Sequence, residues 1–247
     1  DKEVACKAMI MEFMTIKIIP NAARLQLLPW PLLYTHDFYM AMTEMTMGSY
    51  HALVGMDPWD ECGYSYDLEN NLQKPVNRIS TSRSRKVANL LSEATGYETC
   101  YDCSGTLNDT SCTLKEEFAT SDDCKGYRLP TTNELIRAIK PDTSKNYWTS
   151  DGGGNWPPGE HAVCDSEVYL SNTSATPISS FAWYCYNSEN EIHDVAQLEP
   201  TAFGIYDLHG NLAELSNSGN SSFGGYFGTN PEYTSLNRSY GQDNRCA

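Results

Sequence analysis

Two carboxylate residues, Asp207 and Glu214, flank a short segment that can offer main-chain oxygen atoms to a metal ion. Gly204 and Gly210 permit tight turns in this segment, and the apolar residues between them can anchor it to a core. A hard cation such as calcium takes several oxygen ligands, some of them backbone carbonyls. The pattern predicts a calcium site. Its alternative is a hydrogen-bonded turn in which the Asp207 carboxylate accepts from backbone amides.

The cysteine content is the second chemical signal, because nine cysteines are many for a chain of 247 residues. A zinc ribbon is one interpretation of the cluster that opens with Cys100-Tyr-Asp-Cys103. The second pair of the cluster is not a C-x2-C, and the intervening Ser, Gly, Thr, Asn and Asp residues are typical of a disulfide-bonded loop. We therefore expect disulfides and an oxidising compartment. The odd count leaves one thiol free or paired with another chain. The cysteines are Cys6, Cys62, Cys100, Cys103, Cys112, Cys124, Cys164, Cys185 and Cys246.

The formal net charge of -15 argues against nucleic acid or an anionic membrane surface as a partner. The charge is uneven, since the stretch from Asn146 to Asn237 has eleven Asp and Glu residues and neither Lys nor Arg. Such a stretch needs solvent, hydrogen bonds or external cations around its carboxylates. No run is apolar enough to insert into a membrane, because the most apolar one, residues 25–34, is interrupted by two prolines.

Long regular elements are few in the sequence. Apolar residues at helical spacing predict a helix from about Thr81 to Ala94, capped by Ser80 or Thr81 and ended by Gly96. A capping box, Thr131-Thr-Asn-Glu134, predicts a second helix that stops before Pro141. A shorter helix is expected over residues 46–54. Turn residues punctuate the remainder, so we expect one α+β domain with little regular secondary structure.

Three segments, residues 38–50, 126–135 and 202–214, resemble motifs of the formylglycine-generating enzyme family, also called the sulfatase-modifying-factor domain. The family patterns are E-V-T-x-x-x-Y, R-L-P-T-E-A-E-W-E and N-x-(F/Y)-G-L-Y-D-M-x-G-N-V-W-E-W. Three shorter matches are Pro75-Val-Asn-Arg-Ile-Ser80, Gly224-Gly225 and the terminal Asn244-Arg245-Cys246-Ala247.

This resemblance implies a fold and a metal site. The fold would be an α+β variant of the C-type lectin fold over residues 36–247, whereas residues 1–35 lack the family's opening pattern and stay unassigned. Family members bind a structural calcium ion in the loop that contains Asp207. Carried over to this chain, the ligands would be the side chains of Asp207 and Glu214 and the backbone carbonyls of Gly210 and Leu212.

The chain departs from the family at the catalytic centre. The family's oxidases bind copper through two cysteines a few residues after the Gly-Gly turn, but no cysteine stands between Cys185 and Cys246 here. Copper(I) requires such soft thiolate ligands. The segment that contains Glu214 also lacks both tryptophans of the family motif. The five histidines are scattered, with no H-x-H or H-x-x-x-H pair. The sequence therefore predicts no catalytic residue for the family's copper chemistry.

The function we expect is that of a secreted, non-catalytic family member. It would act outside the cell, in a periplasm or at a cell surface, as a binding, adhesive or self-assembling module for protein or carbohydrate. The C-terminal stretch is rich in Tyr, Asn, Ser and Gly, a composition that suits an adaptable binding surface, although its aromatics could instead fill the core. Alternatives are a family oxidoreductase with an altered site and a retroelement-diversified receptor. The candidate ligand contacts are Tyr226, Phe227, Tyr233 and Tyr240.

Overall fold

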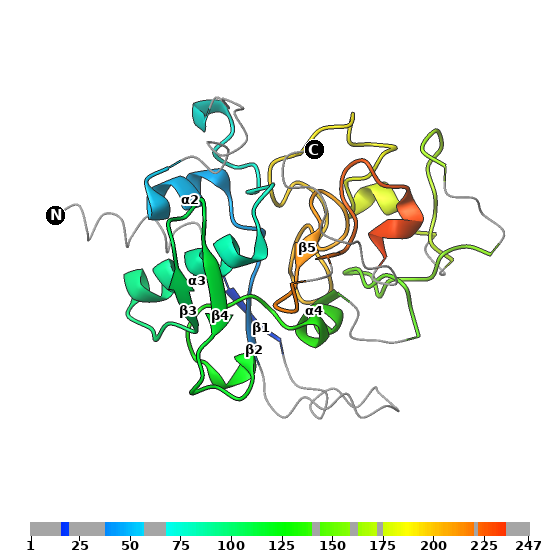
Figure 1. Ribbon diagram of the computed structural model, residues 1–247. Helices are drawn as coiled ribbons and strands as arrows, with labels where there is room; N and C mark the ends of the chain where they lie inside the picture. The colour runs from blue at the N-terminus through cyan, green and yellow to red at the C-terminus, as the bar shows by residue number, and fades with distance from the viewer. Residues whose placement is uncertain are drawn as a thin grey trace.

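The computed structural model describes most of the chain and places its elements in the order that the sequence motifs require. The described residues are 16–19, 38–56, 68–139, 144–158, 163–171, 175–219 and 222–235. In Figure 1 the segments before about residue 130 lie on one side of the molecule, and the long loops between residues 144 and 235 lie on the other. Helix α4 and strand β5 lie between the two.

Three α-helices begin and end at local signals in the sequence. They are α2 (Met47–Val54), α3 (Thr81–Thr95) and α4 (Thr132–Ile139). Thr46 caps α2 through its side chain, and Gly55 ends it in the left-handed region at φ 75°. All three predicted helices are confirmed, within one or two residues at each end.

The capping box before α4 is also confirmed. The Thr131 hydroxyl accepts from the Glu134 backbone N–H at 3.2 Å, and Glu134 Oε2 accepts from the Thr131 backbone N–H at 2.8 Å. Arg128 forms two further bonds to the Glu134 carboxylate, each 2.7 Å long. The Glu134 residue, only 1% exposed, therefore starts the helix and also holds the preceding segment against it.

The Ser80 cap of α3 provides a test of local helix stabilisation. Ser80 Oγ accepts from the Arg83 backbone N–H at 3.2 Å, and this bond satisfies one of the free donors of the first turn. We expect Ser80→Ala to lower the free energy of unfolding by about 1 kcal/mol. Urea unfolding would measure the loss. Ser82→Ala, in the first turn of the same helix, is the matched control, and equal effects of the two substitutions would contradict a capping role.

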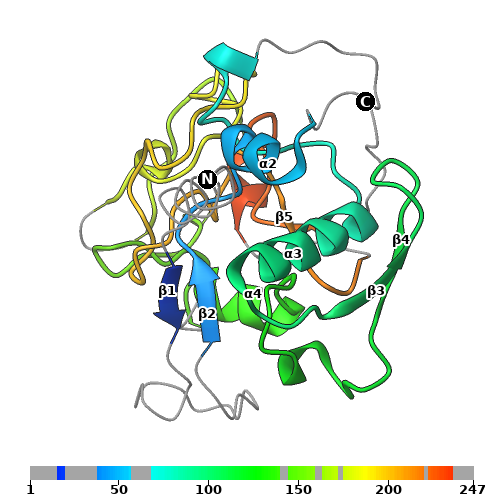
Figure 2. The same cartoon turned by 90° about the vertical axis from the view of Figure 1, so that its left-hand side faces the viewer.

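Each described sheet is a single antiparallel pair of strands. Strand β1 (Ile16–Ile19) pairs with β2 (Phe38–Ala41), and β1 falls in the segment 1–35 to which the sequence assigned no element. Strand β3 (Tyr101–Ser104) pairs with β4 (Ser111–Leu114), and β5 (Glu214–Leu215) pairs with β6 (Ser222–Phe223). Helix α3 packs along the β3–β4 hairpin and against α2 (Figure 2). Short 3-10 helices occupy Leu68–Asn70, Ser121–Asp123, Ile178–Ser180 and Pro231–Thr234.

The core consists of separate clusters rather than one layer. The first joins β2, α4 and the 205–208 loop around Leu135 and Ile139. A second is built from Tyr147, Tyr184 and apolar loop residues, and a third surrounds the buried Cys100. Loops therefore carry much of the core, as the scarcity of long regular elements predicted.

Three disulfides join described cysteines, and two of them resolve the cluster that the sequence left open. Cys100 bonds to Cys124, and Cys103 bonds to Cys112 across directly paired positions of β3 and β4. These bonds confirm the disulfide interpretation, because they use all four sulfurs that a zinc ribbon would need. The third bond joins Cys164 to Cys185. Three disulfides indicate an oxidising compartment.

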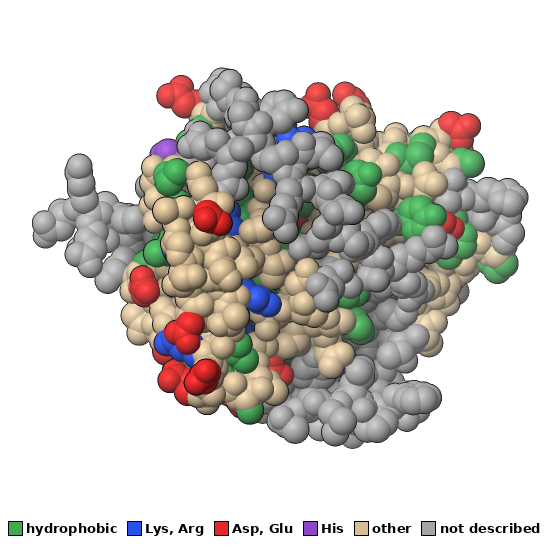
Figure 3. Space-filling view, in the orientation of Figure 1, with side chains coloured by type: hydrophobic (Ala, Val, Ile, Leu, Met, Phe, Trp, Pro, Cys, Tyr) green, Lys and Arg blue, Asp and Glu red, His purple; other side chains and the backbone are tan. Residues whose placement is uncertain are grey.

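The surface carries scattered charge. In Figure 3 Asp and Glu side chains are spread over the face shown, with several close together at its lower left, and Lys and Arg show in only a few places on it. None of the helices in the described part of the chain combines the length and apolarity that a membrane crossing requires.

Candidate functional site

The loop that carries the predicted metal ligands has an unusual backbone. Asp207, Gly210 and Asn211 all have positive φ angles, of 59°, 80° and 54°. A Cβ atom at Gly210 would lie 2.0 Å from the Trp183 carbonyl oxygen, so only glycine allows this approach. Gly210 N–H donates to the Gly224 carbonyl at 2.8 Å, which ties the loop to the Gly-Gly turn. A conformation held in this way can aim several oxygen atoms at one point.

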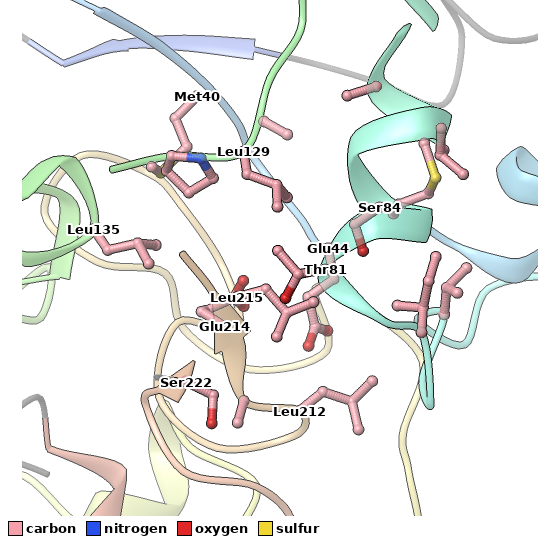
Figure 4. A pocket seen from close by; sticks show the side chains of 18 of the residues that line it. Met40, Glu44, Thr81, Ser84, Leu129, Leu135, Leu212, Glu214, Leu215 and Ser222 are labelled. Carbon is pink, nitrogen blue, oxygen red and sulfur yellow. The ribbon is translucent and has the colours of Figure 1, made fainter. Parts of the chain in front are cut away.

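A third carboxylate joins this loop from a distant part of the chain. Glu44 follows β2, and its Oε2 accepts from the Asn211 side-chain amide at 3.1 Å, while the nearby Leu212 backbone amide acts to lower its pKa. Its other oxygen, Oε1, is fully buried and has no hydrogen-bond partner in the structure. Figure 4 shows Glu44 and Glu214 reaching the same cavity from different elements. A buried carboxylate oxygen without a donor is costly unless a cation or water satisfies it.

The pKa values of all three carboxyls, Glu44, Asp207 and Glu214, are raised, and no nearby positive charge on a described residue opposes the shifts. Burial, followed by repulsion from Asp207, raises the pKa of Glu214 to about 8. Burial raises the pKa of Glu44 well above its usual value, and repulsion from Glu214 and Asp207 adds to this. Burial raises the pKa of Asp207 to about 6, although the Ala196 backbone amide opposes the shift. No described cation is among the groups that shift these three pKa values.

A hard cation fits this set of donors. Within the described residues, no three His, Cys, Asp or Glu side chains could hold a metal ion by themselves. The predicted ligand set, in which the Gly210 and Leu212 carbonyls join two carboxylates, offers the oxygen donors that calcium takes and stays a prediction. The alternative was a hydrogen-bonded turn in which the Asp207 carboxylate accepts from backbone amides. One contact supports it, because Asp207 Oδ2 accepts from the Ala196 N–H at 2.8 Å.

Glu44 is the residue that sequence reasoning missed. It stands in the first family motif, so its position was noticed, but nothing in the local pattern gave it a role. The available signal was an acidic residue within a run of aromatic and methionine residues, where burial of a carboxylate requires a partner.

Three of the four candidate ligand contacts lie at the same cavity as Glu44 and Glu214. Its volume is about 1690 Å³, and Glu44, Glu214, Tyr226, Phe227 and Tyr233 all line it. Tyr226 is 38% exposed and Phe227 is half-buried, and their rings meet edge to face with centroids 5.5 Å apart. Tyr240 lies outside the described residues. The structure therefore brings two of the four predicted metal ligands, Leu212 and Glu214, to the same cavity as three of the four predicted aromatic contacts, whereas Asp207 and Gly210 are not among the residues that line it.

The aromatic residues belong to a tight turn, residues 226–230, which we call the aromatic turn. The Thr229 hydroxyl accepts from the Tyr226 N–H at 3.2 Å and donates to the Tyr226 carbonyl at 2.7 Å. The Phe227 N–H donates to the Asn211 carbonyl at 2.9 Å. This bond joins the aromatic turn to residues 207–214, the loop with the predicted metal ligands, which we call the metal loop. The ring of Tyr226 is therefore presented to solvent by a backbone that is well tied down.

Comparison with known proteins now gives the family. Residues 28–233 match the model of the sulfatase-modifying factor enzyme 1-like domain. The chain belongs to this family. The sulfatase-modifying-factor domain covers most of the described structure, including the metal loop, the aromatic turn and the Cys164–Cys185 disulfide. The assignment predicted from the motifs is thus confirmed.

Relatives share the fold of this sulfatase-modifying-factor domain at low identity. Treponema denticola variable protein 1 is 19% identical, with a TM-score of 0.61 over 94% of this chain and 90% of its own. The crystal structure of CarF gives a TM-score of 0.57 at 17% identity, over 92% of this chain and 91% of its own. PvdO from Pseudomonas aeruginosa gives 0.52 at 15% identity, over 84% and 75%. At such identities these likenesses show the fold alone.

One curated relative matches this chain over part of the relative's length. It is named chaperone protein LppX, from Paenibacillus barcinonensis, and is 24% identical over 185 residues. The match covers 72% of this chain and 61% of the relative, so this sulfatase-modifying-factor domain spans less than two thirds of that protein.

Proposed function

We propose that this protein is a non-catalytic member of the sulfatase-modifying-factor family that binds protein or carbohydrate outside the cell. The observation that carries the proposal is the aromatic turn. Where the family's oxidases place two thiols after the Gly-Gly turn, this chain places the exposed Tyr226 and the half-buried Phe227 at the mouth of a cavity. Tyrosine offers a large amphipathic contact area with few rotatable bonds, and it is enriched in binding surfaces for this reason.

The charge and the relatives support a binding role of this kind. A net charge of -15 disfavours nucleic acid as the ligand. The relative from Paenibacillus barcinonensis is named a chaperone, a role that consists of binding other proteins. We propose secretion or display at the cell surface, which is consistent with the three disulfides.

We also propose that a structural calcium ion supports the site. Asp207 and Glu214 would supply carboxylate oxygens, Gly210 and Leu212 would supply carbonyl oxygens, and the ion would also lessen the repulsion between these carboxylates and the buried Glu44. The ion would neutralise buried negative charge and stabilise the loop that the Phe227 N–H contacts through the Asn211 carbonyl. The ion would have a structural role and take no part in chemistry. By keeping the loop rigid it would reduce the conformational entropy that is lost when a ligand binds.

Array binding with a matched tyrosine control tests the proposed function. Labelled protein should bind a subset of probes on a glycan array or a peptide array. Tyr226→Ala should weaken that binding about tenfold, because aromatic anchors at the centre of an interface commonly contribute more than 1 kcal/mol. Tyr169→Ala is the control, since Tyr169 is 52% exposed and does not line the cavity.

Two outcomes would overturn this proposal. One is the absence of binding to either array together with a monomer in analytical ultracentrifugation, since self-association is the remaining binding mode. The other is a bound transition metal in elemental analysis together with oxidation of a peptide substrate. That second result would favour the altered oxidoreductase instead.

A further inference from the structure

The Cys164–Cys185 disulfide differs from the other two described disulfides in its exposure and its neighbours. Cys164 is exposed and Cys185 is partly exposed. By contrast, each of the other two disulfides has at least one buried sulfur: Cys100, Cys112 and Cys124 are at most 4% exposed, and Cys103 alone among these four cysteines is partly exposed. Thiol–disulfide exchange requires that an attacking thiolate reach a sulfur atom, so access decides which of several disulfides reacts first.

The backbone beside this disulfide supports the aromatic turn. The Cys185 N–H donates to the Thr229 carbonyl at 3.1 Å, and the Thr229 side chain in turn holds both backbone groups of Tyr226. The turn therefore depends on the position of Cys185 as well as on its own hydrogen bonds.

The side chain of Asn230, which lines the cavity, contacts both sulfurs. In the structure its Oδ1 lies 3.1 Å from Cys164 Sγ and 3.8 Å from Cys185 Sγ, and the oxygen and nitrogen of the amide exchange places when the group is turned by 180°. A disulfide sulfur carries no hydrogen and can only accept, so the favourable orientation turns the NH2 group of Asn230 toward the sulfurs. In this orientation the amide would also donate to a thiolate formed there, which favours the release of that thiolate as a leaving group.

We propose that Cys164–Cys185 is a redox-sensitive disulfide that exchanges with dithiols and sets the conformation of the aromatic turn. A thiolate of the dithiol attacks Cys164 Sγ, forms a mixed disulfide and releases the Cys185 thiolate, which takes up a proton. The second thiol of the dithiol then loses its proton and displaces Cys164. The dithiol becomes a disulfide, and the protein disulfide becomes two thiols.

Loss of the bond frees the segment 163–171 from Cys185 and removes a constraint on the Cys185–Thr229 hydrogen bond. The aromatic turn therefore becomes more mobile in the reduced protein. This change in mobility holds whatever the turn binds, whereas redox control of ligand binding rests on the function proposed above.

Differential alkylation of the native protein tests the reactivity. The whole folded chain is treated with dithiothreitol, quenched with iodoacetamide at intervals and mapped by peptide mass spectrometry, which reads each cysteine separately. Cys164 and Cys185 should be labelled about tenfold faster than Cys100 and Cys124, because a buried disulfide reacts only after local opening. Equal rates, or earlier labelling of the buried pair, would overturn the proposal.

Hydrogen exchange tests the structural consequence without any ligand. Peptides that contain residues 226–230 should exchange at least several-fold faster in the dithiothreitol-treated protein, and oxidised glutathione should reverse this. The variant Cys164→Ser/Cys185→Ser should show the fast exchange without reductant, and Cys103→Ser/Cys112→Ser should not. Unchanged exchange in the reduced wild type would refute the link even if the double variant fails to fold. A different result, in which the oxidised protein binds no probe on the glycan or peptide arrays, would count against the proposed function and not against the redox link.

Discussion

Calcium is expected to raise the melting temperature of this protein by about 5–10 °C at pH 8 relative to the protein in EDTA. A ligand that binds only the folded state at a concentration 100 times its Kd adds about 2.7 kcal/mol of stability. For a chain of this size, each kcal/mol shifts Tm by about 2–4 °C. The physical source is the neutralisation of Glu44, Asp207 and Glu214, whose mutual repulsion no described cation relieves. Differential scanning fluorimetry would measure the shift.

One substitution should change stability in opposite directions with and without calcium. In EDTA at pH 8, near the folded pKa of Glu214, this carboxyl is partly ionised, buried and close to Glu44. Glu214→Gln removes that partial charge, so we expect Tm to rise by about 2–4 °C for about 1 kcal/mol of relieved burial and repulsion. With calcium, the same variant loses a ligand and most of the calcium-dependent shift. Glu116→Gln, at an exposed position that does not line the cavity, is the control and should change Tm in neither condition. A variant that keeps the full calcium shift would contradict the proposed site.

The pH dependence in EDTA follows from the same pKa values. Glu214 has a folded pKa of about 8, above its ordinary value of 4.5, so the folded state binds more protons than the unfolded state between these values. The stability from this group is present below about pH 4.5 and is lost as the pH rises toward about 8. Tm in EDTA should therefore receive a falling contribution from pH 5 to pH 8 that Glu214→Gln removes. An identical pH profile for the variant would contradict the raised pKa of Glu214.

The buried pair of Arg128 and Glu134 should give the largest loss of stability. Glu134 receives two bonds from Arg128 and one each from the backbone and hydroxyl of Thr131, all in a place where Glu134 is 1% exposed. Glu134→Gln leaves the Arg128 guanidinium without its charged partner and weakens the cap of α4. We expect the free energy of unfolding to fall by about 3–5 kcal/mol, as measured in urea.

A double variant separates the pair from its surroundings. Arg128→Met/Glu134→Leu removes both charges, so it should be less destabilised than Glu134→Gln, because no unpaired charge is left behind. Arg128 keeps two weaker contacts, with Asp122 Oδ1 at 3.5 Å and with the Leu129 carbonyl at 3.3 Å, and both are too long to replace the lost carboxylate. If Glu134→Gln were no more destabilising than Glu116→Gln, the pair would contribute little.

The sulfatase-modifying-factor fold and the helices could be predicted because their signals are local. A cap such as Ser80 acts on an amide three residues away, and the box from Thr131 to Glu134 closes within one turn, so short stretches of sequence contain the interaction. The motifs around Gly126 and Gly210 preserve positions where a Cβ atom would strike a backbone oxygen at 1.8 Å and 2.0 Å. The absence of a cysteine after the Gly-Gly turn was likewise visible at once.

The site itself could be predicted only in part. The sequence indicated a metal loop and a set of aromatic residues, but not that they share a cavity, and it left the cysteine pairing open. Pairing depends on which Cα atoms approach within bonding reach, and nothing in the spacing of Cys164 and Cys185 distinguishes that pair from others.

By itself, the sequence determined the family, the helix boundaries, the preference for disulfides over zinc and the loss of the thiol pair. The tertiary structure decided that Glu44 completes the carboxylate cluster, since its bond to Asn211 joins residues 167 positions apart. It also decided that Cys185 supports the aromatic turn. The physical reason is common to both. Contacts between distant segments depend on how the whole chain packs, and a buried carboxylate or an exposed disulfide has meaning only through the groups that packing places beside it.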